Sequence, residues 1–261
     1  MGYDHLDVSV DAGVATVTIN RPDVLNGLHP AAHAEMERVW AELGEDDDVR
    51  VAVLTGAGRA FSAGGDLKDM EARLTSDPAG GSGISAAGGR RIVYNLLDFE
   101  KPLIAAVNGH AVGLGATLAL LCDVVIASDE ALFGDPHITI GLVPGDGGLA
   151  VWTVLAGPNR AKEYMMLGSM ASAADAERLG LVNHVVPADD VMPVAQAMAQ
   201  RLAGGPQLAL RGTKIAINAW IKAQFSSLFE VSLAAELHSM AHPDFAEGVR
   251  AAIEKRPPDF E

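Results

Sequence analysis

The stretch from Lys101 to Gly148 constrains this chain most, because one short run combines a strand pattern, a glycine turn and an apolar helix. Residues 101–107 form an apolar run that ends at Asn-Gly, which predicts a buried strand followed by a tight turn. Gly113-Leu114-Gly115 then precedes residues 116–122, which are apolar on every face, so we expect a helix inside the core. Its N-terminus would direct N–H groups and the positive end of the helix dipole at whatever lies over the turn.

A second glycine turn occurs earlier, in the segment Phe61-Ser62-Ala63-Gly64-Gly65-Asp66. A strand end and two glycines come just before Asp66, which is suited to cap a helix. Two such turns can each aim one N–H at a single oxygen, which is the geometry of an oxyanion hole. Glycine before a helix is also ordinary turn chemistry, so either turn by itself leaves both interpretations open.

The two turns and their flanking sequence resemble the enoyl-CoA hydratase/isomerase (crotonase) superfamily. The resemblance rests on the ordered segments FSAGGDLKDM, VNGHAVGLGATLALLCDVVIA and FGDPHITIGLVPGDGG, and on VATVTINRP and EKRPPDF near the two ends. It implies an α/β fold built as a spiral of ββα repeats with a C-terminal helical layer. We expect residues 1–190 to form the spiral core with the acyl-CoA site, and residues 191–261 to form a helical region that serves in trimerisation or as a lid.

The resemblance also implies a site. The N–H groups of Gly65 and Leu114 would hold the thioester oxygen of an acyl-CoA. The backbone around Ala63 would receive the adenine of CoA, and Lys68 would lie near its phosphates. CoA would enter as part of the substrate, so no separate cofactor is expected, and relatives of this kind usually assemble as homotrimers or as hexamers made of two trimers.

The charge balance limits the partners. Nineteen Lys and Arg face 34 Asp and Glu, for a formal net charge of -15, which argues against nucleic acid because phosphate contacts need a basic surface. CoA is itself anionic, so local cations would have to outweigh this field. The candidates are Lys68, Lys101, Lys255 and Arg256.

The single cysteine, Cys122, excludes an internal disulfide and lies in an apolar context that favours a packed thiol over a nucleophile. One Cys and eight scattered His do not suggest a metal cluster. No apolar run approaches the ~18 residues that a membrane helix needs, and the first residues do not form a signal peptide pattern. We therefore expect a cytoplasmic protein that binds neither membrane nor metal.

The acid-base residues of the hydratases are missing. Relatives that hydrate an enoyl-CoA use two glutamates, and the matching positions here hold Thr117 and His137. Threonine cannot be a general base at neutral pH, which counts against hydration by the usual mechanism. Thr117 and His110 are expected to line the substrate.

A different set of ionisable residues surrounds His137. With an ordinary pKa near 6.5, His137 would exchange a proton at working pH, and a carboxylate could fix its tautomer. Asp135 is two residues away, on the same face if the segment is a strand, and Asp146 lies in a Pro-Gly-Asp-Gly-Gly turn. The pair His137 and Asp146 also resembles that of the superfamily's β-diketone hydrolases, such as 6-oxocamphor hydrolase. The alternative is that His137 is packed and Asp146 caps a helix.

Three functions therefore remain open. The first is an enoyl-CoA hydratase/isomerase type enzyme, with Gly65 and Leu114 stabilising an enolate and His137, helped by Asp146 or Asp135, moving the proton. The second is a hydrolase of a carbon-carbon bond in a β-dicarbonyl compound, using the same His137 and Asp146. The third is an acyl-CoA binding protein without catalysis.

The remaining chain predicts alternating strands and helices, then helices alone. Residues 3–20 have the alternation of a hairpin, 29–43 of an amphipathic helix and 51–54 of a buried strand. The glycine-rich residues 75–89 are expected to form a lid or a surface loop. After Gly148 we expect the helices 159–166, 173–179, 208–225, 228–238 and 245–253.

Overall fold

The structure, a computed structural model, describes residues 2–76 and 86–261. Its larger sheet has six strands in the order β1-β2-β3-β5-β7-β10, of which only β1 and β2 are antiparallel. Its strands are β1 (Leu6–Asp11), β2 (Val14–Ile19), β3 (Val51–Gly56), β5 (Leu103–Val107), β7 (Val124–Ser128) and β10 (His184–Val186). The predicted N-terminal hairpin is confirmed, with positive φ at both Ala12 and Gly13 in its turn.

A smaller sheet of four strands, in the order β4-β6-β8-β9, runs beside the first. Its strands are β4 (Ala60–Ser62), β6 (His110–Val112), β8 (Leu132–Gly134) and β9 (Met170–Ser172). The chain enters the large sheet at β3, β5 and β7, and each time the next strand joins the small sheet. This alternation, with a helical segment after each pair, confirms the repeated ββα spiral expected from the resemblance.

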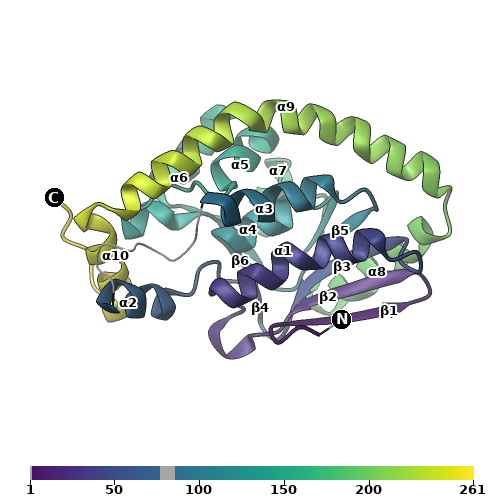
Figure 1. The fold of residues 1–261 in the computed structure, drawn as a ribbon, viewed down its shortest axis with the longest axis horizontal. Coiled ribbons are helices and arrows are strands. Elements are labelled where there is room, and N and C mark those ends of the chain that lie inside the picture. Colours follow the sequence, from purple (N-terminus) through teal and green to yellow (C-terminus); the bar gives the residue numbers. More distant parts are fainter. Residues whose placement is uncertain (1, 77–85) are drawn as a thin grey trace.

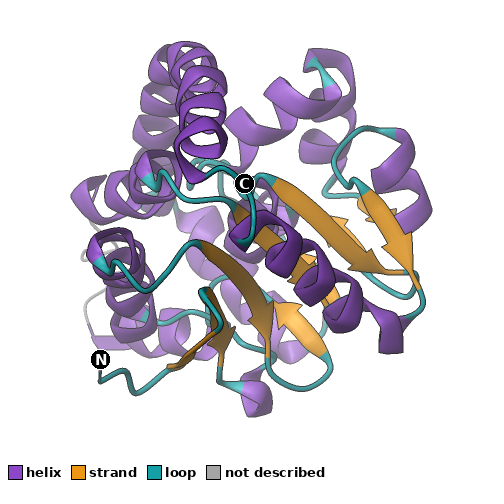
Figure 2. Cartoon of the chain, turned by 90° about the vertical axis from the view of Figure 1, so that its right-hand side faces the viewer, coloured by secondary structure: helices purple, strands orange, loops and turns teal. Residues whose placement is uncertain are grey.

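Helices surround the two sheets, as Figure 2 shows. They are α1 (Pro30–Glu45), α2 (Leu67–Ser76), α3 (Ala86–Asp98), α4 (Leu114–Leu120), α5 (Gly148–Ala156), α6 (Pro158–Leu167), α7 (Ala173–Arg178), α8 (Val191–Ala203), α9 (Gln207–Met240) and α10 (Pro243–Glu254), with short 3-10 turns η1 (Pro22–Val24), η2 (Pro136–Ile140) and η3 (Ala188–Asp190). Every residue of α4 is buried, as its sequence predicts. Cys122 lies just beyond α4 and is also buried, and its thiol donates to the carbonyl of Leu118.

Helix α9 is one continuous helix of 34 residues, so the prediction of two separate helices, 208–225 and 228–238, is wrong. The intervening residues contain no glycine or proline to end a helix. The buried positions Phe225, Phe229, Ser232, Leu233 and Glu236 continue at helical spacing across the expected break. Figure 1 shows α9 passing over the whole molecule to α10, which lies beside α2.

The C-terminal helices pack onto the core. Helix α8 covers strands β3, β5 and β7, and α9 contacts α3 and α5. Most of the glycine-rich loop expected at 75–89 falls on residues 77–85, which lie outside the described residues. Within the described part of the chain, helices that combine the length and apolarity needed to traverse a lipid bilayer are lacking.

Candidate active site

The two glycine turns meet in space. Leu28 N–H donates to the carbonyl of Gly64 at 2.7 Å, which holds the first turn. Gly64 has a φ of +80°, and a Cβ there would lie 2.6 Å from the Val112 carbonyl oxygen and 3.2 Å from the Leu114 nitrogen. Only glycine fits so close to the second turn, so this residue lets the two backbone segments come together.

The N–H groups next to this contact are those proposed from the sequence. Leu114 is the first residue of α4, where helical N–H groups have no partner within the helix. Within residues 2–76 and 86–261, no hydrogen-bond acceptor is found for the N–H of Leu114 or that of Gly65. Both residues line one enclosed cavity. Two backbone donors are therefore available to a ligand there.

This cavity has a volume of about 30 Å³, enough for about two water molecules. Its lining comes from α1, α2, α3, α4, η2, the loop before α5, and α9. The lining residues are Leu28, His33, Gly65, Met70, Gly89, Ile92, Leu114, His137, Leu142, Asp146, Leu233, Glu236, Leu237 and Met240. The Met70 methyl group lies 2.3 Å from where a Gly65 Cβ would be, so a flexible side chain now covers Gly65.

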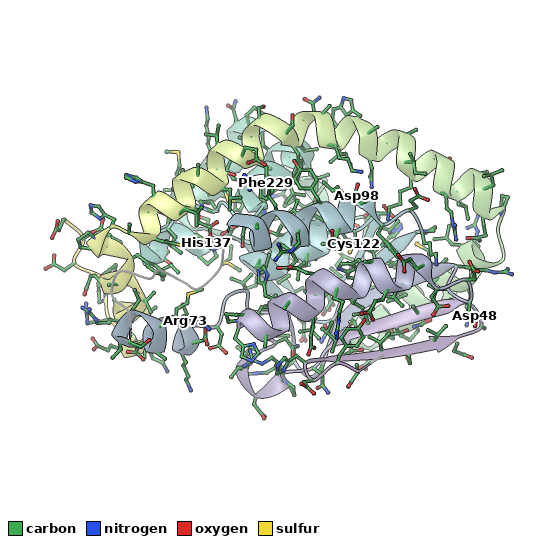
Figure 3. All side chains as sticks on the ribbon, viewed as in Figure 1. Asp48, Arg73, Asp98, Cys122, His137 and Phe229 are labelled. Carbon is green, nitrogen blue, oxygen red and sulfur yellow. The ribbon has the colours of Figure 1, made fainter. Side chains whose placement is uncertain are left out.

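His137 lies between two carboxylates. Its Nδ1 is bonded to Asp135 Oδ1, and its Nε2 is 3.7 Å from Asp146 Oδ2. Asp146 also accepts the Gly148 N–H at 3.3 Å and the Thr117 hydroxyl at 3.5 Å. The structure thus brings together His137, Asp135, Asp146 and Thr117 as the sequence proposed. Figure 3 shows His137 in the half of the molecule that contains α2 and α10, with Asp48 of the acidic turn at the far end.

The prediction that Asp135 and His137 lie on the same face of a strand is wrong. The segment is not a strand, because β8 ends at Gly134 and η2 begins at Pro136. Asp135 instead immediately precedes this 3-10 turn, whose tight winding folds the two side chains together. Asp135 is 1% exposed, and its Oδ2 has no hydrogen-bond partner within the described chain.

The expectation of an ordinary pKa for His137 is also wrong. Burial opposes its charge, but the carboxylates of Asp135 and Asp146 outweigh burial and raise the pKa of His137 to about 10. At neutral pH the ring is therefore an imidazolium. Burial raises the pKa of Asp146 above its usual range, the His137 charge acts against that rise, and Asp135 adds to it.

Glu236 of α9 is a site residue that sequence reasoning missed. It is 6% exposed and lines the cavity with His137 and Asp146. Burial first, and then the Asp146 charge, raise the pKa of Glu236 to about 8, although the His137 charge opposes this. A glutamate on the buried stripe of an amphipathic helix was the available signal, because an acidic residue rarely takes a core position without a function.

His33 is the second missed residue. It is 5% exposed, lines the same cavity from α1, and its Nδ1 is 3.5 Å from Glu37 Oε1. The cavity lining therefore includes residues of both α1 and α9.

Comparison with known proteins agrees with this arrangement. Residues 9–261 match the enoyl-CoA hydratase/isomerase family. The chain belongs to this family. A probable enoyl-CoA hydratase of Mycobacterium bovis is 39% identical over 100% of this chain and 99% of its own length. The 1,2-epoxyphenylacetyl-CoA isomerase of Escherichia coli is 38% identical, covering 96% of each. A crystal structure of an enoyl-CoA hydratase/isomerase from Mycobacterium paratuberculosis superposes with a TM-score of 0.89 at 38% identity, covering 95% of this chain and 99% of the other.

The chain is thus a crotonase-fold enzyme of the enoyl-CoA hydratase/isomerase type. Among residues that the resemblance assigned to CoA, Ala63 is half-buried and its N–H donates to the Leu25 carbonyl at 2.9 Å. Lys68 is exposed at the start of α2. Asp66 caps that helix, because its Oδ1 accepts the N–H groups of Lys68 and Asp69 at 3.2 and 3.4 Å.

Three other expected residues lie elsewhere. His110 is exposed and does not line the cavity; its Nδ1 accepts the Leu132 N–H at 3.3 Å. Lys101 is buried, and its ammonium donates to the carbonyls of Leu43 and Asp46 at 2.7 and 2.6 Å, so it cannot also reach CoA. Arg256 is paired with Glu247 and Glu254.

The expectation that no metal cluster can be assembled is corrected in one respect. Asp135, His137 and Asp146 place one potential ligand atom each within 4.8 Å of one another. The prediction against a metal cluster counted only Cys and His residues and left out carboxylates. In the structure these three residues form an ion-paired group centred on His137.

Proposed function

We propose that this enzyme transfers protons at the α-carbon of an acyl-CoA thioester, as in hydration of an enoyl-CoA or migration of its double bond. The observation that supports this most is one enclosed cavity shared by two free backbone donors and a group of ionisable side chains. Gly65 and Leu114 supply the donors, and His137, Asp146 and Glu236 supply the ionisable groups. The thioester oxygen would accept both N–H groups, and the CoA moiety would extend past Ala63 toward Lys68.

The two N–H groups matter because the reaction places negative charge on the thioester oxygen. Addition of a nucleophile at the β-carbon, or loss of the α-proton, turns the thioester into an enolate. Backbone donors fixed by the Gly64 contact need no rearrangement when this charge develops. One donor of this kind typically contributes about 3 kcal/mol to lowering the barrier.

The surroundings of the two carboxyl groups assign the proton transfers. Asp146, which lies 3.7 Å from His137 Nε2, serves as the base. Glu236, whose pKa burial and the Asp146 charge raise to about 8, serves as the acid. In hydration, Asp146 takes a proton from water while the hydroxyl bonds to the β-carbon, and the double-bond electrons move onto the thioester oxygen as an enolate. Glu236 then protonates the α-carbon. A proton passing from Asp146 to Glu236 restores both groups. His137 stays charged and steadies Asp146.

A second candidate, hydrolysis of a carbon-carbon bond in a β-dicarbonyl compound, is favoured by the contact between His137 and Asp146. In that reaction Asp146 would activate water to attack one carbonyl. The bond to the central carbon would break, and its electron pair would form an enolate held by Gly65 and Leu114. Glu236 would protonate that carbon.

The test is to follow the enoyl absorbance of crotonyl-CoA with purified enzyme. We expect turnover, with kcat reduced about 10²- to 10⁴-fold in Asp146→Asn and unchanged in Asp129→Asn, an exposed control. No turnover of crotonyl-CoA, together with ring opening of a cyclic 1,3-diketone that Asp146→Asn abolishes, would favour the second candidate. Absence of both activities, with equal binding of CoA by the wild type and His137→Ala, would indicate an acyl-CoA binding protein.

A further inference from the structure

The cavity is lined by two kinds of side chain. His137, Asp146 and Glu236 are ionisable. Ile92, Leu142 and, from the last turns of α9, Leu233, Leu237 and Met240 are apolar. If the thioester oxygen is held at Gly65 and Leu114, the acyl chain must pass these side chains.

Each positive charge at the cavity already has a carboxylate partner. No lysine or arginine of the described chain lines the cavity. Its cation, His137, already contacts the carboxylates of Asp135 and Asp146. His33 is paired with Glu37. Any further anion in the cavity would therefore add to the carboxylates of Asp135 and Asp146, which already share one cation.

Burial sets the strength of this effect. Asp135 is 1% exposed, Glu236 is 6% exposed, and the Asp146 side chain is 14% exposed. Like charges in such surroundings repel strongly, and a buried carboxylate without a partner costs several kcal/mol. The upward shift in the pKa of Glu236 has the same two causes, burial and the neighbouring Asp146 charge.

From these contacts we infer that the enzyme selects acyl-CoA substrates whose acyl group is uncharged and rejects those with a carboxylate at the end of the acyl chain. This inference rests on the proposed function for the position of the thioester. The residues that impose the selection are Asp146 by charge, because its counterion His137 is already shared with Asp135, and Leu237 by the absence of a cation at a position where one would fit. Leu237 lines the cavity and is 36% exposed, so a longer side chain there can reach both cavity and solvent.

Binding of non-reacting analogues tests the selection without requiring turnover. The matched pair is 5-methylhexanoyl-CoA and glutaryl-CoA, which have nearly the same shape but differ by one negative charge. Calorimetry should give a Kd about 10²-fold larger for glutaryl-CoA at pH 7. Equal Kd values would overturn the inference even if crotonyl-CoA is turned over, and the proposed function would then stand alone.

A cation introduced into the cavity should reduce the selection against a charged acyl chain. Leu237→Arg should lower the Kd ratio of glutaryl-CoA to 5-methylhexanoyl-CoA at least tenfold. Val231→Arg, on the same helix but 69% exposed and outside the cavity, should leave the ratio unchanged and corrects for general attraction of an anion. An equal change in both variants would show that selection arises from the overall charge of the protein, and would contradict the inference. If the Kd ratio is as expected but crotonyl-CoA is not turned over, the proposed reaction is contradicted and the inferred selection is not.

Discussion

At the residue level, His137 illustrates how charge can outweigh burial. A buried imidazole by itself would lose its proton more easily, but two carboxylates hold the proton on the ring. Asp135 makes the closer contact and is the more deeply buried of the two. We propose that Asp135 positions His137 and keeps it charged, without touching the substrate.

Asp135→Asn should therefore lower the pKa of His137 from about 10, because the stronger of the two carboxylate attractions is lost while burial still opposes the charge on the ring. Two-dimensional NMR of the imidazole nitrogens across pH measures this directly. We expect kcat to fall about 10-fold or more at pH 8, with little change in KM. Asp129→Asn provides the control, and an unchanged His137 titration in Asp135→Asn would contradict the assigned cause.

The variant Glu236→Gln tests whether Glu236 is the general acid. The wild-type rate should fall as pH rises through about 8, since Glu236 then loses the proton it must donate. The glutamine variant should lose most of its rate, on the order of 10²-fold, and this alkaline limb should vanish. Glu230→Gln is the matched control, because Glu230 lies on the same helix outside the cavity, and its side chain is 40% exposed and paired with Arg90. An alkaline limb that persists in Glu236→Gln would assign it to another group.

The same variant has a predicted effect on stability. The pKa of Glu236 is about 8 in the folded protein and near 4.5 when unfolded, so the unfolded chain binds fewer protons between these values. Stability therefore falls as pH rises from about 4.5 to 8. Glu236→Gln should raise Tm at pH 8, by roughly 4 to 8 °C for a gain of about 2 kcal/mol, and not at pH 4. Calorimetry at both pH values measures the difference.

At the level of elements, α9 completes the site. Two buried contacts hold it to the sheet: Lys214 Nζ is 2.8 Å from Asp123 Oδ2 and 2.9 Å from the Lys101 carbonyl oxygen. Near its other end, Glu236 lies against Gly145, where a Cβ would come 2.5 Å from the glutamate Cβ. The glycine in the Pro-Gly-Asp turn thus lets the helix approach Asp146.

Lys101 joins the end of α1 to the start of β5, and its replacement separates a structural from a ligand-binding role. Lys101→Met should lower the free energy of unfolding by about 1 to 3 kcal/mol, because the carbonyls of Leu43 and Asp46 lose their buried donor. The affinity of the Lys101→Met variant for CoA should not change. Lys68→Met should show the reverse, with normal stability and weaker, less salt-dependent CoA binding by calorimetry. Weaker CoA binding in Lys101→Met alone would contradict both assignments.

For the whole molecule, large apolar side chains remain exposed on α6 and α9. Met166 and Leu167 are each 70% exposed, Leu208 is 90% exposed and Trp220 is 58% exposed. Surfaces of this kind often lie between subunits. We propose a homotrimer, or a hexamer of two trimers, as the assembly.

Light scattering on the eluted protein tests the assembly. The expected mass is three or six times that of one chain, and Met166→Lys combined with Leu167→Lys should reduce it if α6 lies at the interface. Lys162→Ala, on the same helix and exposed, is the control. A monomer at micromolar concentration would contradict the proposal.

The sequence by itself determined the N-terminal hairpin, the buried strands β3 and β5, most helices, both glycine turns and the proximity of His137, Asp135 and Asp146. These features depend on residues within a few positions of one another, where periodicity, turn chemistry and motif order are visible. The break expected near residue 226 was wrong because core packing continues along α9 past Ser226 and Ser227.

Only the tertiary structure decided which charges share the cavity. Glu236 and His33 reach it from helices far apart in the chain, and Lys101 is withdrawn from it into the core. The pKa of His137 likewise depends on burial and on carboxylates brought near by folding. Burial and long-range charge are properties of packed elements, so the protonation of this site could not be obtained from the order of its residues.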